Sequence, residues 1–312
     1  MPFVKRFGGN PILQPNKKHT WESDAAFNGC PITVKKNYHL LYRAQSAKGL
    51  STIGDSVSSD RVQFANRHQL ILPHLPWERH GCEDPRVTYM DNAYYIFYTA
   101  IADWPPKPTG IKAAVAVTRN FKTIDEKHLV TPFNAKAMTM FPKRINGKIA
   151  VMLTANSDYP PSTIGISYAD TVDQLWNKQH WIEWYRDLKS HAVPLLRSHH
   201  DHVEIGAPPI LTEKGWLLIY SYIKSYLTSH KFFTIEAALL DLNDPQKVLG
   251  VSPEPLLFPE YEYELSGNIG NIVFPSGALI FNRTVGIYYG AADTSVCLAT
   301  CGLDELLDSL IN

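Results

Sequence analysis

The chain lacks an excess of charge of either sign. Its 312 residues include 30 Lys plus Arg and 30 Asp plus Glu, so the formal net charge is zero. Neither a basic stripe nor an acidic tail is present in the sequence. This balance argues against nucleic acid or an anionic membrane surface as the main partner, because both select clustered positive charge.

Long apolar runs and cysteines are also scarce. No stretch approaches the ~20 apolar residues of a membrane span, and residues 1–10 show no apolar signal core. The four cysteines form no CxxC pair. Cys297 and Cys301 would lie roughly 13 Å apart on an extended strand, which is too far for a disulfide. These features predict reduced thiols and a cytoplasmic location.

Helical patterns are rare, and only residues 303–310 read clearly as a helix. The chain contains instead a repeated pattern built on five aromatic and β-branched runs. These runs cover residues 38–44, 94–100, 149–155, 216–222 and 285–291. Each is typical of a buried β-strand.

Two further segments flank every aromatic run. A proline-bearing segment precedes it, with Pro31, Pro85, Pro142, Pro208 and Pro275. A segment of alternating small residues follows it, over residues 51–58, 111–118, 162–169, 234–240 and 295–300. With a variable outer strand, the unit is a four-stranded blade, and five copies predict a β-propeller. We expect residues 1–312 to form a single all-β domain, a five-bladed β-propeller with a short C-terminal helix.

A propeller brings the first strands of its blades together at one axis, where the pocket is expected. Asn28, Asp84 and Glu204 lie shortly before the prolines of their repeats, so we expect them around one site. Asp84 precedes Pro85, which predicts extended backbone at Asp84, and Arg86 is expected on the same side of the strand. The segment 84–86 is compatible with a turn that contains a local ion pair. It is also compatible with a general acid at Asp84, whose pKa is tuned by Arg86 and by burial.

Several strings together resemble glycoside hydrolase family 130, the mannoside phosphorylases and β-mannosidases, which are five-bladed propellers. They are NPIL (10–13), LLYRA (40–44), CEDPR (82–86), FPKRINGK (141–148), GWLLIY (215–220), NIVFPSGA (271–278) and IYYGAADTSVCLAT (287–300). The resemblance extends over nearly the whole chain. It implies a mannose-containing oligosaccharide as the partner and leaves the linkage, the leaving sugar and the oligomeric state open.

The resemblance also assigns roles to matched positions. Asp84 matches the catalytic acid, which in the phosphorylases protonates the glycosidic oxygen through a sugar hydroxyl. Asn28, Arg43 and Asp293 match positions that hold the mannosyl ring. Glu83 and Arg86 flank the acid and are expected to bind substrate with them. The structural alternatives are a turn residue at Asn28, a buried salt bridge at Arg43 and a loop cap at Asp293.

The chain departs from the phosphorylase pattern at four places. Glu204-Ile205-Gly206 replaces Lys-Ile-Gly, Thr154-Ala155 replaces His-Arg, Tyr220-Ser221-Tyr222 replaces Tyr-His-Gly, and Glu236 replaces a common Gly. The expected phosphate ligands are thus replaced by residues that include two glutamates, which would repel a phosphate dianion. We therefore expect an inverting β-mannosidase in which Asp84 is the acid and Glu204 or Glu236 is the base.

Three alternatives stay open. Lys136, Lys143 and Arg144 lie near the first strand of the third repeat and favour a phosphorylase that releases mannose 1-phosphate. A non-catalytic sugar-binding propeller is less favoured. Either glutamate is also able to form a structural pair with a neighbour such as Lys136 or His202.

Two other features carry weaker predictions. The histidines of the string SHHDH, which are His199, His200 and His202, favour a solvated loop over a metal site because the ligand set is incomplete. We expect no metal and no cofactor. Trp104 and Tyr226 are candidate platforms for sugar stacking.

Overall fold

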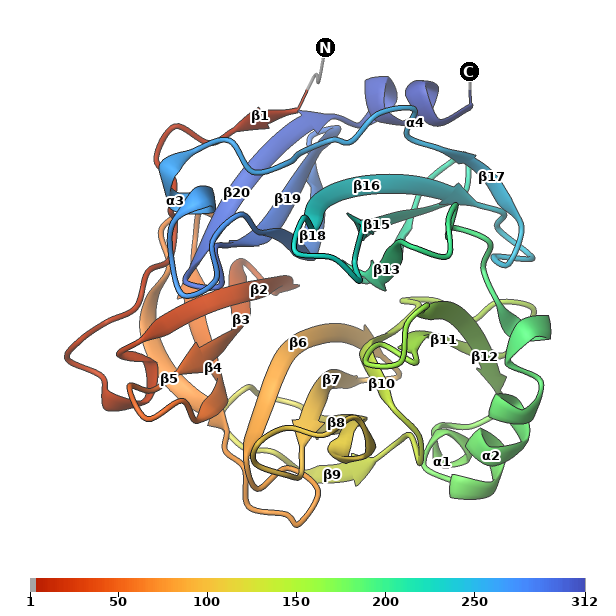
Figure 1. Cartoon of the computed structure of the whole chain (residues 1–312), viewed down its shortest axis with the longest axis horizontal. Coiled ribbons are helices and arrows are strands. Elements are labelled where there is room, and N and C mark those ends of the chain that lie inside the picture. The colour runs from red at the N-terminus through yellow and green to blue at the C-terminus, as the bar shows by residue number, and fades with distance from the viewer. Residues whose placement is uncertain (1–3, 312) are drawn as a thin grey trace.

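The computed structural model describes residues 4–311 and shows an all-β fold with few helices. Its sheets lie around a common centre (Figure 1). The first sheet has eight strands: β2 (Ala25–Val34), β3 (Asn37–Gln45), β4 (Ser51–Ser58), β5 (Ala65–Ile71), β6 (Gly81–Met90), β7 (Ala93–Ile101), β8 (Ile111–Thr118) and β9 (Glu126–Leu129). Two antiparallel groups, β2 to β5 and β6 to β9, meet in this sheet through one parallel pair, Ser51 with Gly81.

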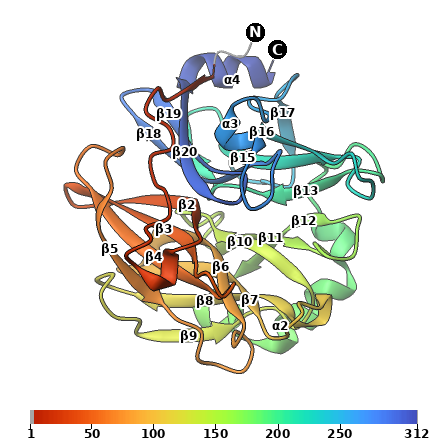
Figure 2. The same ribbon diagram turned by 60° about the vertical axis from the view of Figure 1, so that its left-hand side comes forward.

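Three further sheets complete the fold. The second contains β10 (Ala135–Met140), β11 (Ile149–Ala155) and β12 (Thr163–Ala169). The third contains β13 (His202–Ile205), β14 (Ile210–Leu211), β15 (Trp216–Lys224), β16 (Phe232–Leu240) and β17 (Val248–Val251). The last contains β18 (Val273–Phe281), β19 (Thr284–Ala291), β20 (Ser295–Gly302) and β1 (Lys5–Arg6). Because β1 pairs with β20 and α4 (Leu303–Ile311) follows β20, both ends of the described chain lie at one sheet (Figure 2).

The repeat pattern predicted these strands closely. The five aromatic runs are β3, β7, β11, β15 and β19, and the small-residue segments are β4, β8, β12, β16 and β20. Pro31, Pro85 and Pro275 lie within strands, whereas Pro142 and Pro208 follow the ends of β10 and β13. Proline has no N–H to donate to a ladder, so it is readily placed just beyond a strand.

Two expectations about the elements were wrong. The sheet of β10 to β12 has three strands where four were expected; α1 (Val172–Leu175) and the short 3₁₀ helix Leu188–His191 contact β12 in this part of the fold. Besides α4, the chain also forms α2 (Lys178–Arg186). Trp181 and Trp184 of α2 are buried among apolar side chains of the neighbouring sheets, and burial of such large rings stabilises a helix whose sequence pattern is weak.

The first strands of the groups contact one another around the centre. β2 contacts β6, β6 contacts β10, and β10 contacts β13, while β18 contacts β2 on one side and β15 and β16 on the other. Buried apolar clusters join neighbouring groups: Ala26 and Leu40, for example, pack with Tyr288 and Val296. The strand ends that carry the predicted site residues are therefore held on a packed core.

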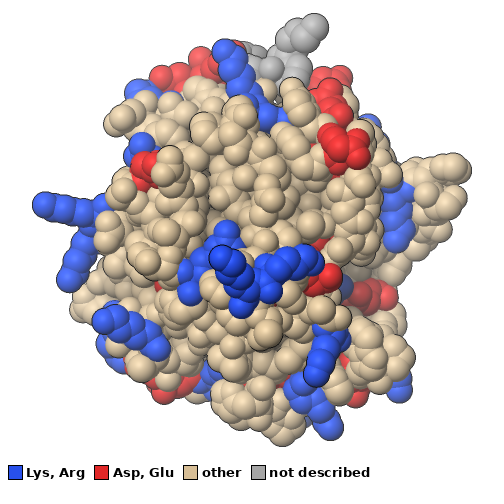
Figure 3. All heavy atoms as spheres, turned by 90° about the vertical axis from the view of Figure 1, so that its left-hand side faces the viewer, with Lys and Arg blue, Asp and Glu red and all other residues tan. Residues whose placement is uncertain are grey.

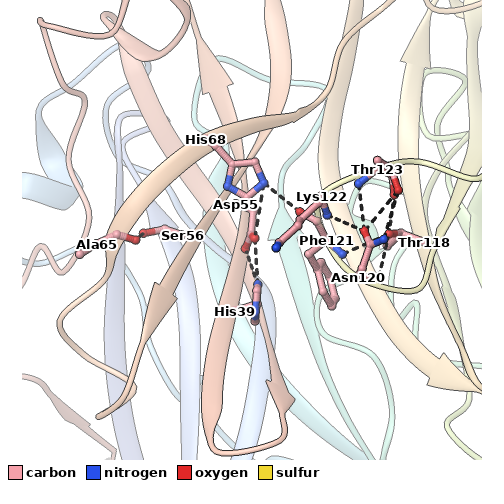
Figure 4. Close-up of polar contacts among 10 residues, drawn as sticks. All are labelled: His39, Asp55, Ser56, Ala65, His68, Thr118, Asn120, Phe121, Lys122 and Thr123. Carbon is pink, nitrogen blue, oxygen red and sulfur yellow. Dashed lines mark hydrogen bonds and ion pairs between the residues drawn. The ribbon is translucent and has the colours of Figure 1, made fainter.

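A polar contact also joins the first two groups (Figure 4). Asp55 on β4 is buried and pairs with Nδ1 of His39 at 2.8 Å. His68 on β5 donates from Nε2 to the carbonyl oxygen of Phe121 at 2.9 Å. Phe121 follows β8, so this bond fixes the loop of one group against the outer strand of the other.

Charges of both signs are distributed over the surface in Figure 3, with a small group of Lys and Arg side chains near the centre of that face. None of the helices in residues 4–311 is both long enough and apolar enough to cross a membrane.

Candidate active site

A cavity of about 340 Å³ collects most of the predicted site residues. Six of the eight predicted residues line it, namely Asn28, Arg43, Glu83, Asp84, Glu204 and Asp293. Lys136, Tyr226, Lys231, Phe233, Ile269, Ile272 and Phe274 complete the lining. The lining thus combines charged groups with aromatic and aliphatic side chains, which is typical of a small-molecule site.

β-Bulges aim Asn28 and Asp84 into this cavity. The β2–β3 register shifts between Phe27 and Cys30, and the β6–β7 register shifts between Glu83 and Arg86. Asn28 has φ +51° and Asp84 has φ +54°. A bulge adds one residue to a strand and redirects its side chain. The two side chains meet, with Nδ2 of Asn28 donating to Oδ1 of Asp84 at 2.7 Å.

The prediction of extended backbone at Asp84 was therefore wrong. Pro85 disfavours the right-handed helical region for the residue before it, but the bulge places Asp84 in the left-handed region and not in the extended one. Asp and Asn tolerate this region better than most residues, and both bulges use one of them at this position.

Arg43 lies between two carboxylates of the cavity. Its Nη2 is 2.7 Å from Oε1 of Glu83, and its Nη1 is 3.8 Å from Oδ1 of Asp84. Nε of Arg43 donates to Oγ of Ser51 at 3.0 Å. The buried partner that an arginine on an apolar strand requires is thus Glu83, and this pair also holds the guanidinium beside Asp84.

Asp293 faces the same group of charges from the turn after β19. Burial, and then the carboxylates of Asp84, Glu83 and Glu204, raise the pKa of Asp293 from 3.8 to about 6, although Arg43 opposes the shift. Burial likewise raises the pKa of Glu83 against the opposing effect of Arg43. Burial and the proximity of other carboxylates thus both favour the protonated form of these two groups.

Glu204 approaches the cavity from β13. Nε2 of His202 lies 3.1 Å from Oε1 of Glu204. The His202 ring stacks on Tyr226, with centroids 4.1 Å apart and an interplanar angle of 12°. His202 is fully buried, so the prediction of a solvated histidine loop was wrong for this residue. His199 and His200 are exposed, as predicted.

Lys136 is the cation that borders Glu204. Its Nζ contacts Oδ1 of Asp158 at 2.8 Å. Burial alone would lower the pKa of Lys136, but the negative charges of Glu204 and Asp158 outweigh it and raise the pKa above its ordinary value. Lys136 therefore stays charged next to the cavity. From the sequence, Lys136 was expected either near a phosphate group or paired with one of the two glutamates, and its pairing with Asp158 had no sequence signal.

The structure does not bring Glu236 to the cavity, contrary to the expectation for a catalytic base. Glu236 is 1% exposed. Its Oε1 accepts from Nη2 of Arg197 at 2.7 Å, and its Oε2 accepts from the hydroxyl of Tyr220 at 2.9 Å. The predicted structural pairing of Glu236 is thus correct in kind, but the partner is Arg197 and not Lys136 or His202.

The same arrangement of tyrosine, glutamate and cation recurs in other groups. Tyr42, Tyr98 and Tyr289 occupy the position of Tyr220 in their aromatic strands, and each donates to a buried glutamate, respectively Glu22, Glu78 and Glu264. These glutamates pair in turn with Arg67, Lys127 and Arg6. The recurrence identifies the surroundings of Glu236 as a repeated structural contact.

Arg86 is likewise buried away from the cavity lining, at 1% exposure. Its Nε donates to the carbonyl oxygen of Gly206 at 2.8 Å and its Nη2 to that of Ile205 at 2.9 Å. Its Nη1 donates to the carbonyl oxygen of Asp84, not to the carboxylate. Arg86 therefore fastens the bulge of β6 to the end of β13 and does not contact the cavity directly.

The remaining candidates lie outside the lining. Lys143 and Arg144 are exposed, and Arg144 pairs with Asp91 at 3.0 Å. Trp104 is 67% exposed on its loop, whereas Tyr226, the other candidate platform, does line the cavity. Within residues 4–311, no group of three His, Cys, Asp or Glu residues has the arrangement of a metal site.

This arrangement supports proton transfer at a bound sugar. Asp84 is partly exposed to the cavity and is oriented by an amide and a guanidinium, as a general acid must be. Glu204 supplies a second carboxylate on another strand of the same cavity, next to Lys136. Apolar side chains such as Phe274 provide faces against which sugar C–H groups pack.

Comparisons with known proteins identify the family of the chain. The family 130 model described as β-1,4-mannooligosaccharide phosphorylase matches residues 3–312. A 1,2-β-oligomannan phosphorylase of Thermoanaerobacter sp. (strain X514) is 32% identical over 312 residues, covering 97% of this chain and 98% of the relative. The β-1,4-mannooligosaccharide phosphorylase of Ruminococcus albus is 31% identical over 320 residues, covering 98% and 90%.

Among solved structures, the β-1,2-mannobiose phosphorylase of Listeria innocua in complex with β-1,2-mannobiose has the same fold. Its TM-score is 0.80 at 24% identity, with 98% of this chain and 99% of that chain covered. The family match extends from residue 3 to residue 312, and the relatives exceed 30% identity over nearly their full length. The predicted resemblance is thereby confirmed, and the chain belongs to glycoside hydrolase family 130.

Proposed function

We propose that this protein cleaves β-mannosides by phosphorolysis, in a single propeller domain of five blades whose axial cavity is the active site. The observation that carries the proposal is the presence of Asp84, at the position of the family acid, in a cavity shared with three cationic side chains. The full-length relatives are phosphorylases of β-linked mannose. These relatives favour phosphate as the nucleophile, whereas the sequence pattern at Glu204 and Glu236 had favoured water.

In this reaction a phosphate oxygen attacks the anomeric carbon while the bond to the leaving sugar breaks. The proton of Asp84 goes to the leaving oxygen, directly or through a sugar hydroxyl, and the new C–O bond to phosphate forms on the opposite face. The products are α-mannose 1-phosphate and a shortened saccharide. Arg43, Lys136 and Lys231 line the cavity and supply positive charge toward a phosphate group.

Hydrolysis is the second candidate, and Glu204 is the observation that favours it. Glu204 places a carboxylate in the cavity, whereas two of the three cations are already engaged by Glu83 and Asp158. A carboxylate in that position is suited to deprotonate water and is unfavourable beside a phosphate dianion. Asp84 retains the same role in both reactions.

A product assay separates the two candidates. The protein is incubated with β-1,2-mannobiose and, separately, β-1,4-mannobiose, each with and without inorganic phosphate. Phosphorolysis requires turnover only with phosphate and yields mannose 1-phosphate. Hydrolysis yields mannose at the same rate in both conditions. An Asp84→Asn variant controls for a contaminating mannosidase, and the absence of any Asp84-dependent cleavage of either disaccharide would refute both candidates.

A further inference from the structure

His202 belongs to a motif that the proposed reaction has not used. It lies two residues before Glu204 on β13, so both side chains project from the same face of the strand. The His202 side chain is fully buried, and its Nε2 is 3.1 Å from Oε1 of Glu204. Within residues 4–311, its Nδ1 has no hydrogen-bond partner.

These contacts determine where the imidazole carries its hydrogen. A carboxylate oxygen only accepts, so Nε2 must donate to Glu204. An N–H at Nδ1 would be buried without an acceptor, which is unfavourable. The contacts therefore place a hydrogen on Nε2 of His202, which donates to one oxygen of Glu204.

Tyr226 and the backbone hold this histidine in place. The His202 ring stacks on Tyr226, which lines the cavity. The backbone N–H of Tyr226 donates to the carbonyl of His200 at 3.0 Å. Asp201 accepts from the backbone N–H of Ser225 at 2.9 Å. The string 199–202 thus anchors the loop after β15, and that loop covers His202.

We propose that His202 is a positioning residue that fixes Glu204 for the incoming nucleophile. With Oε1 held by His202, the other oxygen, Oε2, has no hydrogen-bond partner within the described chain and is available to the cavity. It accepts the hydrogen of an O–H group on the nucleophile, which is either water or hydrogen phosphate. This role rests on the proposed cleavage of β-mannosides in this cavity, and it holds for both nucleophiles.

Three variants of the full chain test the role: His202→Gln, His202→Asn and His202→Leu. A glutamine amide reaches the position of Nε2 and donates to Glu204, whereas asparagine and leucine do not. We expect His202→Leu and His202→Asn to lower kcat by about tenfold to a hundredfold with little change in KM. His202→Gln should recover kcat to within about fivefold of the parent protein. His199→Leu, at an exposed position of the same string, is the matched control.

The possible outcomes separate the two proposals. If the parent protein cleaves neither mannobiose, the proposed function fails, and the role of His202 fails with it. If the parent protein is active but the glutamine variant, folded by circular dichroism, is as slow as the asparagine variant, only the role of His202 is refuted. Unchanged kcat in a folded His202→Asn protein refutes it as well. Should His202→Leu fail to fold, the glutamine and asparagine pair decides.

Discussion

Glu204 and Glu236 belong to the same sheet, and their surroundings differ in nearly every respect. Glu204 on β13 pairs across the ladder with Ser221, whereas Glu236 on β16 pairs with Tyr220. Ser221 and Tyr220 are consecutive on β15, so the two glutamates project from opposite faces of the sheet. Glu204 lines the cavity, while Glu236 is buried with Tyr220 and Arg197.

The contrast teaches how a repeated fold separates structure from chemistry. Glu236 has counterparts in Glu22, Glu78 and Glu264, which are buried glutamates that accept from an equivalent tyrosine. A contact that recurs in several groups of strands is explained by its role in stability, so its presence does not indicate a catalytic role for Glu236. The cavity residues differ instead from repeat to repeat: Asn28 and Asp84 occupy equivalent bulges and carry different side chains.

The largest effect is expected at Asp84. Asp84→Asn retains the shape of the side chain and its contact with Asn28 but removes the transferable proton. We expect turnover of mannobiose to fall by about a thousandfold or more. Affinity for mannobiose, measured by calorimetry, should stay within about tenfold. Loss of binding together with turnover would instead mean that Asp84 holds substrate without acting as the acid.

A smaller loss is expected at Glu204, and it sharpens the comparison directly. Glu204→Gln removes the charge on the cavity side of the sheet and should lower kcat by about a hundredfold. Under the hydrolytic candidate, added azide or formate should restore part of the lost rate, since a small anion then replaces water as nucleophile. Unchanged kcat in this variant would exclude Glu204 from both mechanisms.

Much of the difference between the surroundings of Glu204 and Glu236 could not be predicted from the sequence. The aromatic runs predicted β3, β7, β11, β15 and β19 because buried strands have a strong compositional pattern. The family resemblance predicted six of the cavity residues, five at matched or flanking positions and Glu204 at a departure from the phosphorylase pattern. The strand register and bulges leave no such pattern, and a shift of one residue reverses the face of every side chain. The face of Glu236, the left-handed backbone of Asp84 and the role of Arg86 all depend on register or bulges.

Substitution of Glu236 should lower the stability of the fold and leave the rate of mannobiose cleavage nearly unchanged. In Glu236→Gln, the tyrosine and arginine lose their charged acceptor in a buried setting, and we expect unfolding free energy to fall by about 1–3 kcal/mol. Chemical denaturation measures this loss, and kcat should stay within about threefold. Glu78→Gln is the matched variant in another group, since Glu78 pairs with Tyr98 and Lys127. A Glu236→Gln protein that is as stable as the parent but inactive would instead indicate a catalytic role for Glu236.

The smallest effect concerns the pH dependence of stability through Asp293. Its pKa is raised to about 6 from 3.8, first by burial and then by the neighbouring carboxylates. A raised pKa means that the folded state favours the protonated carboxyl, so the associated stabilisation is present below pH 3.8 and is lost as the pH rises through 6. Between pH 5 and pH 7.5, the parent protein should therefore lose stability relative to Asp293→Asn, by about 1 kcal/mol after allowance for solvent at the cavity. Urea unfolding of both proteins at the two pH values measures the difference. A parallel pH response of the two proteins would show that neither burial nor the neighbouring carboxylates raise the pKa of Asp293 in the folded state.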